Sequence, residues 1–503
     1  MGEASGVDRY ILSIDQSTQA TKAILFDATG NPVCRVAKTH EQIYPAAGQV
    51  EHDPMEIFAN VESAALEVLH RAAVPASKIV SLSITNQRET ILAWDSETGL
   101  PVHNAIVWQD GRGSLLCESL RMAGKADIIK EKTGLRLDPY FSASKLAWIV
   151  RECEGARAAI RAHRLLAGTI DSWLMWKLSG RRVFATDYSN ASRTMLFNIE
   201  KLAWDEELID LFGLRGIRLP DPHCSDSLFG EAMIPGFDAT LPIYGVMGDS
   251  HAALFGHCGW KAGDAKATYG TGSSIMTNIG TSRLDPGDGV VLSLAWGFKG
   301  LATHVLEGNI HSTGYTLRWL RDNLGLFSTY DEAERLAIEA RNNGGVYLVP
   351  AFSGLGAPRW VHGIRAIVTG LSHGSNRGHI VRAGLESIAF QIFELVAEMN
   401  SRTRVPLAQL HVDGGPTRNG FLMQFQADLL GIPVIVPKVE ELSALGVAFM
   451  GGISCGLWSG TGEVGALPVE TNTFQPRMDE MERVALIEGW RSAVEQAISR
   501  RVE

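Results

Sequence analysis

Residues 10–39 read YILSIDQSTQATKAILFDATGNPVCRVAKT. Two apolar runs rich in β-branched residues are separated by a short polar turn, and a second turn at 27–30 precedes a third run. This pattern predicts three strands joined by tight turns. Apolar residues at helical spacing follow over 53–71, with Asp53 placed to cap the helix and Pro54 at its first position. The next segment, IVSLSITNQ, is again typical of a strand.

The second half of the chain repeats this order of elements without repeating the sequence. The segments AKATYGTGSSIMTNIG, GVVLSLAWGF and LATHVLEGNI are predicted strands, and a helix is predicted over 312–323. No short repeat period of the solenoid kind is visible. The sequence therefore predicts an α/β fold with two domains, 1–257 and 258–503, and a ligand-binding cleft between them.

Composition and charge narrow the class of protein. The 503 residues are enough for two or three packed domains, and 45% hydrophobic residues are typical of a globular chain. The 46 Lys and Arg residues against 56 Asp and Glu give a net charge of −10, which argues against a nucleic-acid partner. The six cysteines form no C-x-x-C pair, so neither a disulfide framework nor a zinc ribbon is indicated.

Two apolar features bear on location. The N-terminal residues lack the basic region and long apolar segment of a secretion signal, so we expect a cytoplasmic protein. The uncharged stretch 442–462 has the length of a membrane span, but several Gly and Ser residues interrupt it and no basic flank accompanies it. We predict a buried core helix that ends in a loop, and no membrane partner.

Three turns of small residues follow predicted strands, at 15–22, 269–274 and 413–420. Turns of this composition can present backbone N–H groups to phosphate oxygens. Each one alone is more typical of an ordinary tight turn, and their common position after predicted strands is what indicates phosphate binding. The G-x-x-x-x-G-K-[ST] pattern and the protein-kinase loop motifs are absent, so neither of those phosphate-binding designs applies.

Two carboxylates stand at the ends of predicted strands. Asp15 is placed to hold Mg²⁺, commonly through water, and Asp249 to take the proton from an alcohol nucleophile. The alternative for Asp249 is the N-cap of the helix that follows. The nearby His251, His257 and Cys258 do not have the spacing of a zinc site.

Further polar and aromatic residues follow the strand IVSLSITNQ. Arg88 and Glu89 together could donate to and accept from vicinal hydroxyls, the alternative being a surface ion pair. Trp108 could form a flat wall against the carbon side of a polyol, or could be a plain core residue. Trp173 and Trp176 are interpreted as helix packing.

With these residues in view, the chain resembles the FGGY family of carbohydrate kinases, and most closely its members that phosphorylate glycerol. The resemblance runs from about residue 10 to about residue 460. The matching stretches include IDQSTQATKAILFD, ITNQRET, NAIVWQD, TGLRLDPYFSASKLAWI, TDYSNASRTMLFNI, GDSHAALFG, TYGTGSS, VPAFSGLGAPRW and VDGGPTRNGFLMQFQADLLG. It implies two ribonuclease-H-like domains of the actin-type ATPase kind, the first with the polyol site and first phosphate turn, the second with the nucleotide site.

The resemblance also implies roles for particular residues, with ATP and Mg²⁺ as cofactors. Asp249 would be the general base, and Asp15 and Asp249 would lie at the metal. Residues implied at the acceptor are Arg88, Glu89, Trp108, Tyr140, Asp249, Ser250 and Ser274. Residues implied at the nucleotide are Thr18, Gln19, Lys22, Thr271, Gly314, Arg318, Gly415 and Asn419. The expected reaction is ATP-dependent phosphorylation of a terminal hydroxyl, most simply glycerol to glycerol 3-phosphate, by a homodimer or homotetramer.

Departures from the family pattern leave the acceptor open. Ser250 and His251 stand where members acting on glycerol usually have two glutamines, and Ser273 and Ser274 stand in place of Cys-Phe. A larger, more polar pocket would also admit a longer polyol or ketose such as erythritol, threitol, xylulose or ribulose. A non-catalytic ATP-binding regulator of the same fold is the alternative from another class. The joint presence of the acceptor residues and Asp249 argues against it.

The nucleotide side departs from the pattern as well. Gln19, Ala20 and Lys22 stand where Thr, Ser and Arg are more usual, and Arg318 replaces a Gln. Lys22 can still neutralise phosphate, as a point charge without the planar fork of Arg. ATP therefore remains the expected phosphoryl donor.

Overall fold

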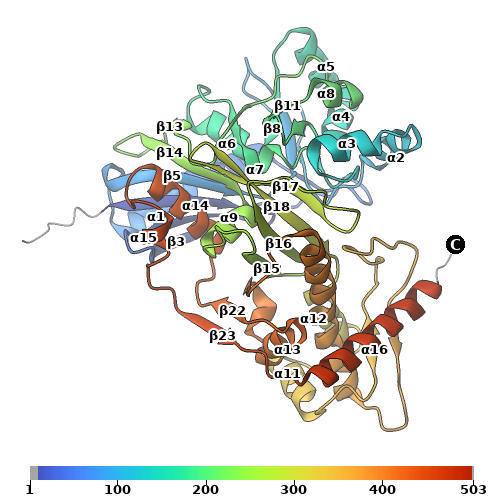
Figure 1. The fold of residues 1–503 in the computed structure, drawn as a ribbon. Helices are drawn as coiled ribbons and strands as arrows, with labels where there is room; N and C mark the ends of the chain where they lie inside the picture. The colour runs from blue at the N-terminus through green and yellow to red at the C-terminus, as the bar shows by residue number, and fades with distance from the viewer. Residues whose placement is uncertain (1–8, 501–503) are drawn as a thin grey trace, which may run out of the picture. The chain divides into compact units, whose positions relative to one another are not determined.

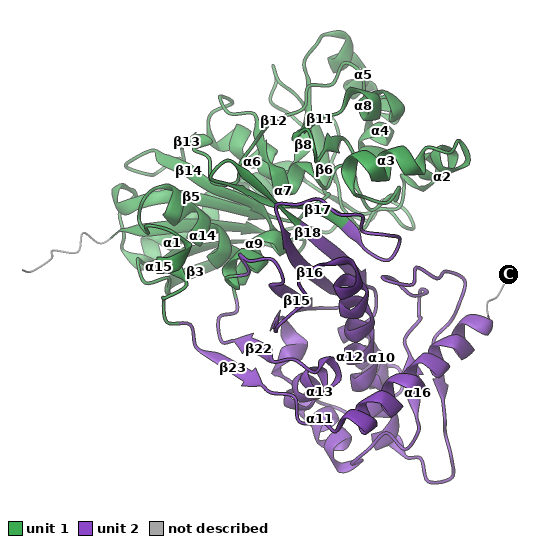
Figure 2. Cartoon of the chain, in the orientation of Figure 1, with its two compact units in different colours: residues 1–258, 292–304, 441–468 green, residues 259–291, 305–440, 469–503 purple. Residues whose placement is uncertain are grey.

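The computed structural model describes residues 9–500, which form two compact units (Figure 2). The first unit holds the described residues up to Cys258 together with Leu292–His304 and Glu441–Pro468. The second holds Gly259–Val291, Val305–Glu440 and the described residues from Val469 onward. This division differs from the single domain boundary predicted between residues 257 and 258, because two segments that come later in the chain belong to the first unit.

The first unit is built on a six-stranded mixed sheet (Figure 1). Its strand order is β13 (Gly230–Ala232), β14 (Leu241–Gly248), β5 (Ile79–Asn86), β1 (Tyr10–Gln16), β2 (Ala20–Phe26) and β3 (Pro32–Thr39). β1, β2 and β3 pair antiparallel, as the turns between them predict, whereas β5 runs parallel to β1 and β14 runs parallel to β5. The three predicted N-terminal strands are therefore confirmed.

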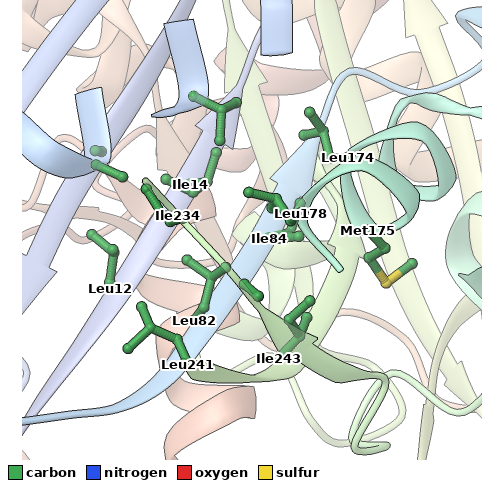
Figure 3. Packing of buried hydrophobic residues seen from close by; sticks show 14 of the residues in the cluster. Leu12, Ile14, Leu82, Ile84, Leu174, Met175, Leu178, Ile234, Leu241 and Ile243 are labelled. Carbon is green, nitrogen blue, oxygen red and sulfur yellow. The ribbon is translucent and has the colours of Figure 1, made fainter. Parts of the chain in front are cut away.

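One face of this sheet packs on two helices. Helix α1 (Pro54–Ala72) begins as predicted, with the Asp53 side chain accepting from the Met55 N–H. Helix α6 (Ile170–Leu178) is buried almost throughout. The side chains of this core include those of strands β1, β5 and β14 and of α6 (Figure 3), together with side chains of α1 and β2. Those labelled in the close-up include Leu12, Ile14, Leu82, Ile84, Leu174, Met175, Leu178 and Ile243.

The other face packs on helix α14 (Leu442–Ser454), which contacts β1, β5 and β14. Glycines permit the close approach: a methyl group added at Gly451 would meet the Ser81 and Ser83 hydroxyls. The buried helix predicted for the uncharged stretch is thus confirmed and ends at Ser454. Within residues 9–500, no helix is both long enough and apolar enough to cross a membrane.

A smaller four-stranded sheet completes the first unit. Its order is β4 (Glu51–His52), β7 (Ala105–Ile106), β6 (Ile91–Asp95) and β8 (Leu165–Thr169). Trp94 of β6 packs edge-on against Trp173 of α6, which stacks on Trp176 at 5.8 Å, so both tryptophans pack as predicted. The remaining elements are η1 (Ala76–Lys78), α2 (Ser114–Met122), α3 (Ala126–Thr133), α4 (Ser142–Glu152), α5 (Glu154–Arg161), β9 (Ala185–Asp187), α7 (Tyr188–Ala191), β10 (Phe197–Asn198), β11 (Ala203–Trp204), α8 (Glu206–Leu211), β12 (Asp221–His223), α9 (Asp249–Gly256) and α15 (Thr461–Val464).

The second large sheet has seven strands. Their order is β17 (Val291–Phe298), β18 (Leu301–Ile310), β16 (Ser273–Gly280), β15 (Ala265–Tyr269), β21 (Leu410–Asp413), β22 (Val434–Pro437) and β23 (Thr471–Phe474). β15, β21 and β22 run parallel, so the ends of β15 and β21 lie side by side. Leu292–His304, which include nearly all of β17 and the first residues of β18, are counted with the first unit. The further elements of the second unit are α10 (Gly314–Asp322), α11 (Tyr330–Glu339), β19 (Tyr347–Val349), β20 (Ile367–Thr369), α12 (Arg377–Arg402), η2 (Gly415–Arg418), α13 (Gly420–Leu430) and α16 (Glu480–Ser499).

Candidate active site

Three neighbouring parallel strands of the first unit end at one edge of its sheet. In the register, Gln16 of β1 and Gly248 of β14 both lie opposite Asn86 of β5. The carboxyl ends of adjacent parallel strands are where α/β proteins place ligands. Asp15, Arg88 and Asp249, which are distant in sequence, are thereby brought to the same edge.

Asp15 lies directly across from Lys22 in the β1–β2 pair. Its side chain is buried, and Lys22 Nζ lies 3.3 Å from Asp15 Oδ2. Burial raises the pKa of Asp15 to about 6, although the ammonium group of Lys22 acts in the opposite direction. Lys22 Nζ also lies 2.7 Å from Glu441 Oε2, and Arg35 Nη2 lies 2.7 Å from Glu441 Oε1.

Asp249 occupies the first position of α9, and the N-cap is Gly248. The alternative that Asp249 is the N-cap is therefore wrong. Asp249 Oδ1 accepts from the Ser250 N–H at 2.6 Å and lies 3.1 Å from Arg88 Nε. The Asp249 side chain is 37% exposed, and its backbone carbonyl accepts from Ser443 Oγ of α14 at 3.0 Å. Two contacts to Oδ1 thus fix the orientation of the Asp249 carboxylate, while its side chain remains partly accessible to solvent.

Arg88 and Glu89 are both buried, so the alternative of a surface ion pair is wrong. The guanidinium group of Arg88 faces Asp249, while Glu89 Oε1 accepts from Arg193 Nε at 2.6 Å. Glu89 has a φ of +59°, an unfavourable conformation for a residue with a side chain. Its carbonyl accepts from Ser142 Oγ at 2.9 Å. The surrounding structure therefore fixes both the backbone and the carboxylate of Glu89.

Trp108 joins the expected acceptor wall to the first phosphate turn. The half-buried indole packs edge-on against Tyr140, and its Nε1–H donates to Thr18 Oγ1 at 3.0 Å. Trp108 is thus more than a plain core residue. Beside Thr18, the side chain of Gln19 is exposed. Ser250 is half-buried next to Asp249.

In the second unit, the turns after β15 and β21 are neighbours. Gly414 has a φ of +97°, and a methyl group there would clash with the Tyr269 carbonyl at the end of β15. The Gly314 N–H at the start of α10 donates to the Gly270 carbonyl at 3.0 Å. The Thr271 carbonyl accepts from the backbone of the same helix end. The structure therefore brings the 269–274 turn, the start of α10 and the 413–420 turn together.

The other predicted residues of the second unit have defined surroundings. Ser274 Oγ donates to Glu307 Oε1 at 3.3 Å, and Glu307 is fully buried. Arg318 lies over the ring of Tyr315, with 5.4 Å from its Cζ to the ring centre. Asn419 caps α13 by accepting from the Leu422 N–H. Gly415 begins η2, and a methyl group there would meet only open space.

Comparison with known proteins assigns the family. The sequence matches the N-terminal domain of the FGGY family of carbohydrate kinases over residues 10–256 and the C-terminal domain of that family over residues 265–455. The chain belongs to the FGGY family of carbohydrate kinases. As an FGGY kinase it is a phosphotransferase with an alcohol acceptor. The resemblance stated from the motifs is confirmed.

Individual relatives match this FGGY kinase over nearly its whole length. Glycerol kinase 1 of Thermotoga maritima is 47% identical over 97% of this chain and 100% of its own length. The glycerol kinase of Symbiobacterium thermophilum is 46% identical over 97% of this chain and 98% of its own. The crystal structure of Plasmodium falciparum glycerol kinase with ADP superposes with a TM-score of 0.92 and 34% identity, covering 98% of both chains. The predicted two-domain α/β, actin-like ATPase fold is confirmed.

The carboxylates of this FGGY kinase offer a donor set for Mg²⁺. Within residues 9–500, no three His, Cys, Asp or Glu side chains gather to hold a metal ion by themselves. Magnesium usually takes one or two carboxylates and completes its coordination with water and phosphate oxygens. Asp15 and Asp249, close enough for the charge of Asp249 to raise the pKa of Asp15, fit that requirement.

Sequence reasoning missed three residues that hold the site. Glu441 pairs with Lys22, Arg193 pairs with Glu89, and the buried Lys145 donates to the Tyr140 and Pro139 carbonyls. Burial lowers the pKa of Lys145 to about 8. Arg193 and Lys145 lie in stretches of sequence that resemble the family, and this resemblance could have identified them as site residues. Glu441 had no signal, because its partner lies more than 400 residues earlier in the chain.

Proposed function

We propose that this FGGY kinase transfers the γ-phosphoryl group of ATP to a terminal hydroxyl of glycerol and forms glycerol 3-phosphate. The observation that carries the proposal is the meeting of Asp15, Arg88 and Asp249 at the ends of three adjacent parallel strands. The relatives named glycerol kinase, at 43–47% identity over nearly the whole chain, support glycerol as the acceptor.

Asp249 would act as the general base. Its Oδ1 already accepts from the Ser250 N–H and faces Arg88, so the hydroxyl proton would go to Oδ2. The oxygen that loses this proton forms the new bond to the γ-phosphorus, and the bond from that phosphorus to the β-γ bridging oxygen breaks. ADP leaves with the bridging oxygen. Arg88 would keep the base oriented during the transfer.

The cofactor sites divide between carboxylates and backbone amides. Asp15 and Asp249 would hold Mg²⁺, which supplies neutralisation of the charge on the β- and γ-phosphate oxygens when it is bound. Lys22 and the turn with Thr18 and Gln19 would face the phosphates from the first unit. The small-residue turns at 269–274 and 413–420 would present N–H groups to the nucleotide.

The acceptor side would be formed by rigid groups. Glu89, held by Arg193, would accept from hydroxyl groups of the acceptor, and Arg88 would donate to them. Trp108 and Tyr140 would form the wall against the carbon chain. Ser250 and Ser274 would leave more room than the Gln and Phe common in this position. A longer polyol or ketose is therefore the alternative acceptor.

The test compares acceptors in one assay of ADP formation. Glycerol, erythritol, the threitols, pentitols, xylulose and ribulose are compared by kcat/KM at saturating ATP and Mg²⁺. We expect glycerol to be best. A higher kcat/KM for a longer acceptor would contradict glycerol as the substrate, and nucleotide binding without turnover of any acceptor would favour a non-catalytic regulator.

A cytoplasmic location and assembly into a homodimer or homotetramer are also proposed. Light scattering of the purified protein measures the oligomeric state.

A further inference from the structure

We propose that Glu441 is a positioning residue for phosphoryl transfer, which holds the ammonium group of Lys22 at the first phosphate turn and shares it with Asp15. The inference deepens the proposed function and rests on it only for the identity of the reaction. Glu441 belongs to no predicted turn or motif, and it reaches the site because α14 packs in the first unit.

The distances show which carboxylate holds Lys22 more closely. Lys22 Nζ lies 2.7 Å from Glu441 Oε2 but 3.3 Å from Asp15 Oδ2. A lysine ammonium is a compact charge on a flexible four-carbon stem, and it can turn toward any nearby carboxylate. With Glu441 present, the shorter and stronger contact goes to Glu441, and the contact with Asp15 Oδ2 is the longer of the two. Asp15 then shares the charge of Lys22 with Glu441, and would keep more of its own negative charge for Mg²⁺.

Glu441 is itself firmly held. Its second oxygen, Oε1, lies 2.7 Å from Arg35 Nη2 of β3, so both carboxylate oxygens are occupied. Its side chain is only 14% exposed. It directly precedes the first residue of α14, where the helix dipole favours a negative charge. The carboxylate is thus a fixed anchor between the side chains of β2 and β3.

The anchor is joined to the general base through the same helix. Two residues after Glu441, Ser443 Oγ donates to the Asp249 carbonyl at 3.0 Å. Lower in the helix pair, Gly446 packs so closely on the Ala252 carbonyl of α9 that no side chain would fit. The start of α14 therefore touches both the residue proposed as base and the lysine proposed for phosphate, and Glu441 provides its charged contact.

The test is a double-mutant cycle in ADP affinity, measured by titration calorimetry on the full chain. We expect Lys22→Met to weaken ADP binding about tenfold, and Glu441→Gln to weaken it by a similar factor. In the Glu441→Gln background, the additional change Lys22→Met should lower the ADP affinity less than twofold, because Glu441 no longer holds Lys22 in place. Glu463→Gln, at an exposed acidic residue of the same segment, is the matched charge control and should leave affinity unchanged.

Several outcomes would overturn the proposal. Additive effects would mean that Glu441 acts independently of Lys22, and tighter ADP binding by Glu441→Gln would mean that its charge only repels phosphate. If Glu441→Gln does not fold, Glu441→Asp gives the same test, with an affinity between those of the wild type and Lys22→Met expected.

The kinetic readout separates positioning from a structural role. Glu441→Gln should lower kcat at least tenfold and leave the acceptor KM within twofold, and an equal kcat would contradict the proposal. ADP binding needs no acceptor, so the cycle stays informative even if glycerol is not phosphorylated.

Discussion

Two buried arginines, Arg88 and Arg193, each hold one carboxylate of the candidate site. The first faces a carboxylate that is partly open to solvent, and the second faces one that is buried. The two pairs therefore differ in what they contribute. The pair with Asp249 would orient the proposed base, whereas the pair with Glu89 neutralises a charge that is buried away from water.

Asp249→Asn should remove the proposed general base and keep the shape of the site. We expect kcat to fall by about 10²–10⁴, the usual contribution of a positioned base. ADP affinity, measured by calorimetry, should stay within a few-fold of wild type. Transfer at an unchanged rate would show that another group takes the proton.

Arg193→Met should destabilise the first unit strongly. Removing one partner of a buried ion pair leaves an uncompensated charge on Glu89 and costs about 3–5 kcal/mol. Urea denaturation measures the change. The control is Arg215→Met, which breaks an exposed pair with Asp210 and should have a much smaller effect. Equal losses in the two variants would contradict the buried-pair interpretation.

Ser274→Phe tests the size of the acceptor pocket. Ser274 is half-buried and donates to the buried carboxylate of Glu307, so a ring there fills space and removes a polar contact. We expect the ratio of kcat/KM for glycerol to that for erythritol to rise severalfold. The acceptor panel gives this ratio directly. An unchanged ratio of kcat/KM between the two acceptors would show that residue 274 does not determine acceptor specificity.

Helices α9 and α14 are packed through glycine. Gly446→Ala should place a methyl group against the Ala252 carbonyl, and the two helices would have to separate. Such overpacking typically costs about 1–3 kcal/mol, and the Asp249 end of α9 should move with it. The melting temperature, measured by thermal unfolding, and kcat are both expected to fall.

Gly462→Ala provides the matched control, because a methyl group there meets nothing within 4 Å. This variant should be neutral or slightly stabilising in unfolding experiments. A similar loss at both glycines would mean that the destabilisation does not come from the α9–α14 contact.

Elements whose cause is local could be predicted from sequence. The strands of β1, β2 and β3 and the start of α1 at Pro54 follow from alternation, turn residues and the Asp53 cap. The helix start near Asp249 was predicted one residue late, because Gly248 takes the cap position by backbone conformation alone. Asp15 and Asp249 lie at the ends of strands, as predicted, but their meeting at one edge of a single sheet depends on the pairing of β1 and β14 with β5.

Pairings between distant segments could not be predicted in the same way. Glu89 and Arg193 are 104 residues apart, and Lys22 and Glu441 are 419 apart. Nothing in the spacing of either pair fixes the contact, which depends on how whole helices and strands pack. The positive φ of Glu89 likewise follows from the turn that its neighbours impose.

Each unit of the molecule buries one carboxyl group whose pKa is raised to about 7, Asp171 in the first and Glu386 in the second. Burial is the main cause in both, and the neighbouring Asp187 adds to it for Asp171. Between about pH 4 and pH 7 the unfolded chain has released these protons and the native state has not. Each group therefore lowers the free energy of unfolding as pH rises through this range.

Asp171→Asn and Glu386→Gln should remove this dependence one unit at a time. Relative to wild type, each variant should gain stability as pH rises from 4 to 7 and gain nothing further above pH 7. Urea denaturation at several pH values measures the difference. A difference in the free energy of unfolding between variant and wild type that does not change with pH would show that the carboxyl group titrates near its ordinary pKa.

The first unit is discontinuous, and this has a consequence for synthesis of the chain. A ribosome releases Asp15, Arg88 and Asp249 well before α14, which covers one face of the sheet that carries them. One face of the sheet therefore stays uncovered by α14 during translation of the residues of the second unit that precede residue 441. A chain terminated before residue 441 would carry the proposed base and metal carboxylates and still expose an unfinished core, so it should bind chaperones and aggregate.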